Sequence, residues 1–377
     1  SVVGTMEGIG DNATDATFYA TYTPPGDGFE GIVQATGSSG NGAFSETLQV
    51  EWSLSQIQNF SQMITQNTFT VYGKDRVIVG DPAVSIKGNV GSNASERLSK
   101  KSDTDPGLFF HQNFQIEGSL QIGLGGDVDE FSGAVKDPTK VTVGSSSFPD
   151  PEIPPTPTNS SSLDSTISSP GVIPFSETEI QYNSLTLNAG SQENPTVLTL
   201  GTGNSSENTV VLITNSLTLN SHSSIEVSGQ GKAEVYVLNS LSVTGKAKIG
   251  SGIKLYYFGE DSLTLSGQIS FFSEAFFSVR ADVKITGQAS FSGNFFSANP
   301  IFFELTGSCE NSMIIYAPHS SVKVTGSASS TAIICDTAEI GGSADLNYLF
   351  DEDIPDLDIS FSSSSSSNDV FLWLETL

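Results

Sequence analysis

Apolar and polar residues alternate in a short phrase that occurs seven times between residues 224 and 342. In each copy a polar residue lies between two apolar ones, and a small residue and a glycine follow. A period of two predicts a strand with one buried face and one solvent face. The glycine turns the chain because it reaches positive φ without steric cost. These glycines follow one another at 16 to 22 residues, a spacing typical of stacked repeats: Gly229, Gly245, Gly267, Gly287, Gly307, Gly326 and Gly342.

A second apolar strand lies between successive phrases. Strands that begin at Leu255, Phe276, Phe295, Ile314 and Ile333 align when the phrases are stacked. The gaps hold no amphipathic helix, so a crossover helix is excluded and a coil of parallel strands remains. We therefore expect an all-β fold. It would be a right-handed parallel β-helix with a small N-terminal β-meander, one short helix and a capping C-terminal segment.

The polar position inside the phrase predicts how the strands stack. Stacked coils would bring these side chains to about 4.8 Å from one another. The last four alternate in sign, which indicates ion pairs that fix the register on a solvent face. Lys284, Glu304 and Lys323 should then lie on three neighbouring strands of one sheet. The full column would be Glu226, Ser242, Thr264, Lys284, Glu304, Lys323 and Glu339.

The rest of the chain divides by pattern and composition. Alternation from residue 17 to 52 predicts a three-stranded antiparallel meander, and capping-box spacing at 53–56 predicts a helix over 54–64. Seven of the 16 prolines lie between residues 145 and 174, and proline favours extended chain. The expected divisions are 1–66 (meander and helix), 67–144 (first part of the β-helix), 145–176 (Pro/Ser-rich crossing segment), 177–350 (main β-helix) and 351–377 (C-terminal cap).

Charge excludes some partners. The 42 acidic residues outnumber the 15 basic ones, for a net charge of −27. Nucleic acid needs Lys and Arg opposite its phosphates, so we expect no nucleic-acid partner. A strongly charged surface keeps a protein soluble, and this composition fits an extracellular, cell-surface protein.

Adjacent aromatic residues are the sharpest candidate for a binding site. Neighbours in a strand face opposite sides, so one member of each pair should face outward. In one interpretation a loop or the Pro-rich 145–174 segment covers that stripe. In the other, a flat aromatic strip stacks on sugar rings or on a partner protein. The candidate carbohydrate-binding residues are Tyr236, Tyr256, Tyr257, Phe276, Phe277, Phe295 and Phe296.

Other chemistry is weaker in the sequence. No GxSxG, HExxH or CxxC motif occurs, and the outer column alternates Lys and Glu singly, so we expect no enzyme. The acidic runs 127–130 and 351–353 offer hard oxygen ligands for calcium but lack EF-hand spacing, so solvated turns are the default. A disulfide between Cys309 and Cys335 stays open.

Several stretches carry a resemblance to a known family. Residues 313–326, 332–334 and 338–342, with 69–93 and the closing Trp-Leu-Glu, resemble the C-terminal β-helical region of PilX-type type IV pilus assembly proteins. The same architecture occurs in tapirins, cellulose-binding surface proteins encoded beside pilus genes. The resemblance implies possible type IV pilus components as partners. The hydrophobic N-terminal helix of such proteins is not found in this sequence, so the mode of anchoring stays open.

Together these features predict a non-catalytic, cell-surface or pilus-associated adhesin. It would bind insoluble polysaccharide, with cellulose favoured, through an exposed aromatic face. Two alternatives remain. One is a structural minor pilin or a bactofilin-like stacking protein, and the other is a β-helical polysaccharide lyase or hydrolase.

Overall fold

The computed structural model contains two compact units, residues 1–58 and 59–377. Most of the chain forms β-strands, and nearly all strands of the second unit pair in parallel. No helix among the described residues has the length and apolar character needed to cross a membrane. The structure describes residues 2–6, 16–23, 30–38, 45–53, 69–173, 179–201, 209–228, 231–288, 290–291, 293–307, 313–327, 329–330, 332–347, 359 and 361.

The first unit contains a four-stranded antiparallel sheet in the order β1-β2-β3-β4. The predicted meander is confirmed, with one strand more than expected. The helix predicted over 54–64 lies outside the described residues. The strands are β1 (Val2–Met6), β2 (Ala16–Thr23), β3 (Glu30–Ser38) and β4 (Ser45–Ser53).

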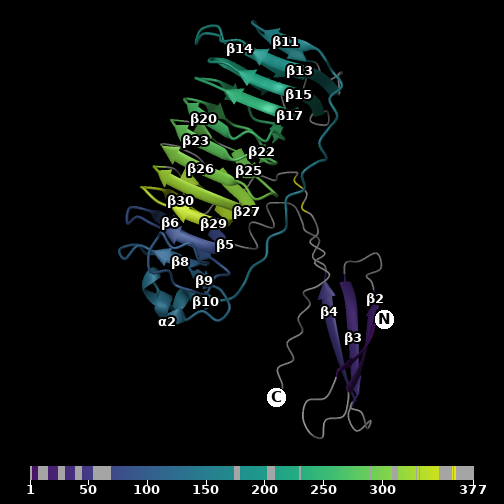
Figure 1. The fold of residues 1–377 in the computed structure, drawn as a ribbon, viewed down its shortest axis with the longest axis vertical. Helices are drawn as coiled ribbons and strands as arrows, with labels where there is room; N and C mark the ends of the chain where they lie inside the picture. The colour runs from purple at the N-terminus through teal and green to yellow at the C-terminus, as the bar shows by residue number, and fades with distance from the viewer. Residues whose placement is uncertain are drawn as a thin grey trace. The chain divides into compact units, whose positions relative to one another are not determined.

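A sheet of seventeen described strands dominates the second unit (Figure 1). Its described strands pair in parallel, as the repeated phrase predicts. In chain order the strands are β5 (Phe69–Val79), β7 (Asn89–Gly91), β8 (Gly107–Phe110), β9 (Leu120–Ile122), β10 (Val141–Val143), β11 (Asp164–Ile167), β13 (Glu179–Leu187), β15 (Thr209–Leu219), β17 (Lys232–Val243), β19 (Ile253–Tyr257), β20 (Leu263–Gly267), β22 (Ala275–Ser278), β23 (Val283–Gly287), β25 (Gly293–Phe296), β26 (Phe302–Gly307), β27 (Met313–Gly326) and β29 (Ala332–Ile340).

Two smaller parallel sheets alternate with the long one along the chain. The chain passes from β13 to β14, back to β15, on to β16 and back to β17, so each circuit visits both sheets. The six-stranded sheet contains β12 (Gly171–Ile173), β14 (Thr196–Leu200), β16 (Ser223–Val227), β18 (Lys248–Ile249), β21 (Ser270–Phe271) and β24 (Ser290–Phe291). The three-stranded sheet contains β28 (Ser329–Ser330), β30 (Asp345–Asn347) and β6 (Ser85–Lys87).

The long sheet bends around a corner. Strands β15, β27 and β29 run through it, and their pairing registers shift there, between Thr214 and Ser216 for example. In the middle of the sheet the corner instead separates two strands, as between β19 and β20. A β-bulge is the usual device for such a bend. The strands before and after the corner therefore form two faces around one interior.

The order of strands in space differs from their order in the chain. Strand β5 pairs in parallel with β29, with Val71 opposite Ile333, and β6 pairs with β30. From β5 the chain continues to β10, runs along the sheet to β11 at its far end, and returns strand by strand to β29 (Figure 1). The edges of β29 and β30 are therefore covered by β5 and β6. The predicted cap, residues 351–377, lies outside the described residues apart from Ile359 and Phe361.

The last four members of the predicted charge column are confirmed as neighbours on successive strands. Lys284 pairs with Glu304, Glu304 with Lys323, and Lys323 with Glu339. Two ion pairs link the column, Lys284 Nζ to Glu304 Oε2 at 2.6 Å and Lys323 Nζ to Glu339 Oε1 at 3.2 Å. Its first member was wrong, because Glu226 lies on β16 in the six-stranded sheet and pairs with Thr199.

The interior of the stack is continuous and apolar. Side chains such as Leu217, Leu255, Phe276, Ile315 and Val71 form one buried cluster through the second unit. At the β10 end a short helix, α2 (Val128–Phe131), is followed by two 3₁₀ turns, η1 (Ser132–Ala134) and η2 (Pro138–Lys140). Phe131 is fully buried in the same cluster, so this helical segment closes that end of the core.

The phrase glycines make a tight stack at the end of the strands. Gly326 has φ 88°, and a Cβ placed there would lie 2.7 Å from the carbonyl oxygen of Gly307 on the next strand. We expect Gly326→Ala to destabilise the fold by about 1–2 kcal/mol or more. An alanine held at this positive φ costs about that much, and the close contact with the Gly307 carbonyl adds to it. Urea unfolding measures the change.

Gly133→Ala is the matched control, because a Cβ there meets no atom within 4 Å and φ is ordinary. We expect it to shift stability by less than about 0.5 kcal/mol. Equal stability of the Gly326 and Gly133 variants would contradict the close stacking of the turns.

Candidate functional site

One column of side chains runs along the outer side of the long sheet. Pairing registers connect its members strand by strand. We call it the outer aromatic column, and in spatial order it contains Ile213, Tyr236, Tyr256, Phe277, Phe296, Tyr316, Ile334 and Tyr72. It belongs to a second buried cluster that is separate from the interior.

The two members of each aromatic pair do face opposite sides, as predicted. Tyr257, Phe276 and Phe295 point into the interior cluster, whereas Tyr256 and Phe277 point outward. The expected exposure is wrong, however, because both sides are covered. The seven candidate residues are all buried, with exposed fractions of 8% for Tyr236, 6% for Tyr256, 2% for Tyr257, 0% for Phe276, 1% for Phe277, 0% for Phe295 and 0% for Phe296.

The rings of the column stack on one another. Ring centroids are 4.8 Å apart for Tyr236 and Tyr256, 4.7 Å for Tyr256 and Phe277, and 5.0 Å for Phe277 and Phe296, with interplanar angles of 12°, 17° and 23°. Each ring face therefore rests against a neighbouring ring. Sugar rings pack on aromatic faces, so this column presents only ring edges and hydroxyl groups to a ligand.

The cover is the proline-rich segment after β10, as the first interpretation of the stripe predicts. We call residues 144–163 the strap. Phe148 and Ile153 of the strap pack against the outer aromatic column, and the Phe148 ring lies 4.7 Å from that of Tyr72. Phe361, from the C-terminal part, packs edge-on against Tyr316 at 5.3 Å and pairs with Pro151 of the strap.

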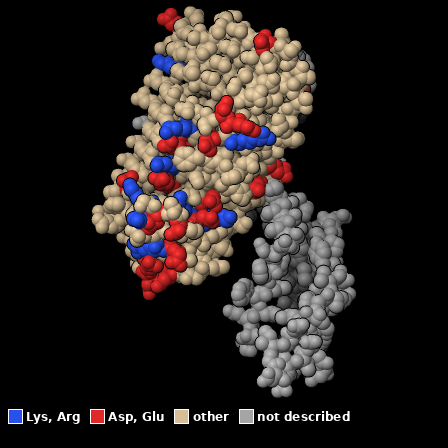
Figure 2. All heavy atoms as spheres, in the orientation of Figure 1, with Lys and Arg blue, Asp and Glu red and all other residues tan. Residues whose placement is uncertain are grey.

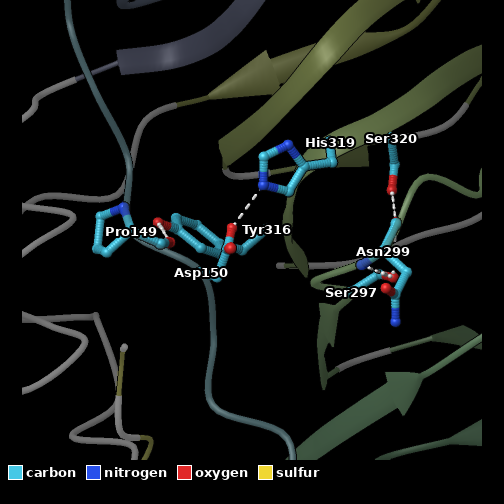
Figure 3. A network of polar contacts seen from close by, with 7 residues as sticks. All are labelled: Pro149, Asp150, Ser297, Asn299, Tyr316, His319 and Ser320. Carbon is cyan, nitrogen blue, oxygen red and sulfur yellow. Dashed lines mark hydrogen bonds and ion pairs between the residues drawn. The ribbon is translucent and has the colours of Figure 1, made fainter. Parts of the chain in front are cut away.

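Polar contacts hold the strap to β27 (Figure 3). The Tyr316 hydroxyl donates to the Pro149 carbonyl at 2.6 Å, and His319 Nε2 lies 2.7 Å from Asp150 Oδ1. Nearby, Ser320 donates to the Asn299 carbonyl at 2.9 Å, which joins β27 to the turn after β25. Here the strap is therefore held to β27 by a buried phenol and by a hydrogen bond between the half-exposed side chains of His319 and Asp150.

A groove opens where the strap passes the other half of the column. It has a volume of about 620 Å³ and is lined on the sheet side by Glu234, Tyr236, Lys254, Tyr256 and Phe277. The strap side is formed by residues 152–155, and Ile359 adds to the wall. This volume lies within the roughly 300–1,000 Å³ of ordinary ligand sites. Three of the seven candidate residues thus meet at one groove, and the other four do not reach it.

Charged side chains line the groove beside the ring edges. Glu234 and Lys254 are register partners on β17 and β19, and exposed Glu152 faces them from the strap. Tyr236 donates its hydroxyl to Glu234 Oε2 at 2.8 Å, and burial, then this carboxylate, raises the pKa of Tyr236 well above its usual range. The phenol therefore stays a hydrogen-bond donor, and the groove offers both donors and acceptors.

The sequence interpretation missed these charged residues. A signal was present, because Glu234 and Lys254 lie two positions before the aligned Tyr236 and Tyr256 and so share their face. Glu152 could not be found that way, since a strap has no strand periodicity.

Metal and thiol chemistry find little support among the described residues. No group of three or more His, Cys, Asp or Glu side chains there is placed to hold a metal ion. Asp127 caps α2 by accepting from the Asp129 amide, and the 351–353 run lies outside the described residues. Cys335 is a buried free thiol whose pKa burial raises, and Cys309 lies outside the described residues.

Comparison with known proteins gives no relative. No family model, curated protein or solved structure matches this chain. Any functional statement about it therefore depends on its own residues.

The anchored phenol predicts a stability effect. We expect Tyr316→Phe to destabilise the second unit by about 1 kcal/mol, because it removes one buried hydrogen bond and leaves the Pro149 carbonyl without that donor. Urea unfolding measures this. An unfolding free energy equal to that of the wild type would contradict this anchoring role.

Buried phenols also predict a pH dependence. Burial raises the pKa of Tyr72, Tyr236, Tyr257 and Tyr316. A raised folded pKa means that the stabilisation is complete below the unfolded value of about 10 and is lost as pH rises above it. We expect the urea midpoint to hold to about pH 9.5 and to fall beyond it. A midpoint unchanged to pH 11 would contradict the burial of these phenols.

Proposed function

We propose that the second unit is a right-handed parallel β-helix that binds an insoluble, uncharged polysaccharide at the cell exterior without catalysis. The in-register parallel pairing and the return of the chain to alternate sheets support the fold. The groove beside the strap supports the binding role and is the observation on which the proposal rests.

Groove chemistry suits carbohydrate. Neutral sugars present hydroxyl groups that both donate and accept, and the groove places two carboxylates, a lysine and a phenol around apolar ring edges. Hydrogen bonds to charged groups are the stronger ones, at about 1.5–3 kcal/mol each. The ligand would lie along the strap with its polar edge toward Glu234 and Lys254.

Charge argues for a neutral polymer over an acidic one. Glu152 and Glu234 outnumber Lys254 in the groove, and the whole chain carries −27. A polyanion such as a pectate would be repelled at short range by the carboxylates of the groove and at long range by the net negative charge of the chain. Cellulose as the polymer and a location beside a type IV pilus are the parts of this proposal that come from the sequence resemblance to PilX-type proteins and tapirins.

The test measures cellohexaose affinity by calorimetry and retention on microcrystalline cellulose by pull-down. Glu234→Gln and Glu152→Gln should each lower cellohexaose affinity roughly fivefold or more, because each replaces a charged acceptor by a neutral one. Glu260→Gln makes the same change on an exposed residue outside the groove and should match the wild type.

Two results would overturn the proposal. Wild-type protein that binds neither cellohexaose nor cellulose removes the binding role, and groove variants that bind like the wild type remove the groove. Release of reducing sugars during incubation would instead favour the hydrolase alternative.

A further inference from the structure

A second feature lies on the adjoining face of the same sheet, beyond the corner. The outward side chains of β11, β13, β15 and β17 form two straight columns that we call the hydroxyl face. Register pairings define both columns. One column contains Asp164, Ser184, Ser216 and Ser240, and the other contains Thr166, Thr186, Thr218 and Ser242.

The face is rigidly built. On β13, β15 and β17 the residues between these positions point inward and are buried, with Leu185 at 0%, Leu217 at 1% and Leu241 at 7% exposure. On β11 the corresponding residue, Ser165, is half-buried. Neighbouring strands are about 4.8 Å apart, and alternate residues on one strand are roughly 6.6 Å apart. The hydroxyls therefore form a regular grid over a buried apolar layer. Members of one column even contact each other, as Ser240 donates to the Ser216 hydroxyl at 2.9 Å.

Charge is nearly missing from this part of a strongly acidic protein. Asp164 is the one charged residue in the two columns, and its carboxylate accepts from the Asn183 amide at 2.8 Å. On the same face, charges begin farther along the stack, where Thr264 pairs with Lys284. Figure 2 shows charged side chains gathered over the lower strands and few around β13 and β15.

Exposure leaves the grid accessible. Thr166, Ser240 and Ser242 are exposed, and Thr186 and Thr218 are half-buried. Short side chains lose less conformational entropy when they are fixed than lysine or glutamate would. An uncharged grid of short hydroxyl side chains thus suits a flat, ordered and uncharged surface, and many weak contacts would act together on it.

We propose that the hydroxyl face is the docking surface for the ordered face of a crystalline, uncharged polysaccharide. This inference rests on the proposed function and assigns different parts of the polysaccharide to two different surfaces. The groove takes a single chain, whereas the hydroxyl face adsorbs to many aligned chains whose own hydroxyls repeat at regular spacing. Both contacts fit uncharged ligands.

The experiment compares Thr218→Lys and Ser242→Lys with the wild type on microcrystalline cellulose and on soluble cellohexaose. A long, strongly hydrated ammonium interrupts the grid, so adsorption to crystals should fall roughly tenfold. Affinity for cellohexaose should stay within about twofold of the wild type, since the groove is untouched. Ser251→Lys places the same charge on an exposed turn and should adsorb normally.

The outcomes separate the two proposals. Crystal adsorption that is unchanged in both lysine variants, while groove variants lose cellohexaose, overturns this inference and leaves the groove in place. Wild-type protein that binds neither ligand removes both. Adsorption to ice that the lysine variants abolish, with cellulose adsorption unchanged, also overturns it. Far-UV circular dichroism and the unfolding midpoint confirm that each variant is folded, and Ser242, being exposed, provides the variant least sensitive to packing.

Discussion

Parallel strands in register are the constraint on which the rest of this structure depends. Each strand of the long sheet must find the same backbone geometry above and below it, so equivalent side chains lie directly over one another. Leucines then stack into an interior, rings into the outer aromatic column, and lysines beside glutamates into ion pairs. The same constraint aligns the glycine turns so closely that a methyl group would collide with the next carbonyl.

That constraint also creates a need for cover. A sheet with apolar rings on its outer side cannot leave them in water, and the strap meets this need with Phe148, Ile153 and the anchoring contacts of Pro149 and Asp150. Where the strap stands away from the sheet, a groove remains beside Tyr236 and Tyr256. Cover and binding site are thus two consequences of one segment, which also carries the chain from β10 to β11.

Much of this could be predicted from the sequence, because local alternation and repeat spacing encode strands and their stacking. The column through Lys284, Glu304 and Lys323 and the opposed facing of Phe276 and Phe277 follow from such patterns. The pairing of β5 with β29 could not be predicted, since nothing local marks two strands more than 250 residues apart as neighbours. The burial of the outer rings was open for the same reason, because proline-rich composition predicts an extended segment but not its path. The hydroxyl face was visible in the repeated Ser-Leu-Thr-Leu phrases but has meaning only once those phrases are known to be neighbours.

Cross-linking tests most directly whether β5, the first strand of the long sheet in the chain, lies beside β29, the last. Arg76 and Thr337 are register partners on β5 and β29, so Arg76→Cys with Thr337→Cys, in a Cys309→Ser, Cys335→Ala background, should form a disulfide on mild oxidation. Ser321 lies one strand farther, opposite Thr337, and Arg76→Cys with Ser321→Cys should remain reduced. Failure of the first pair to cross-link, or equal cross-linking of both, would contradict the account.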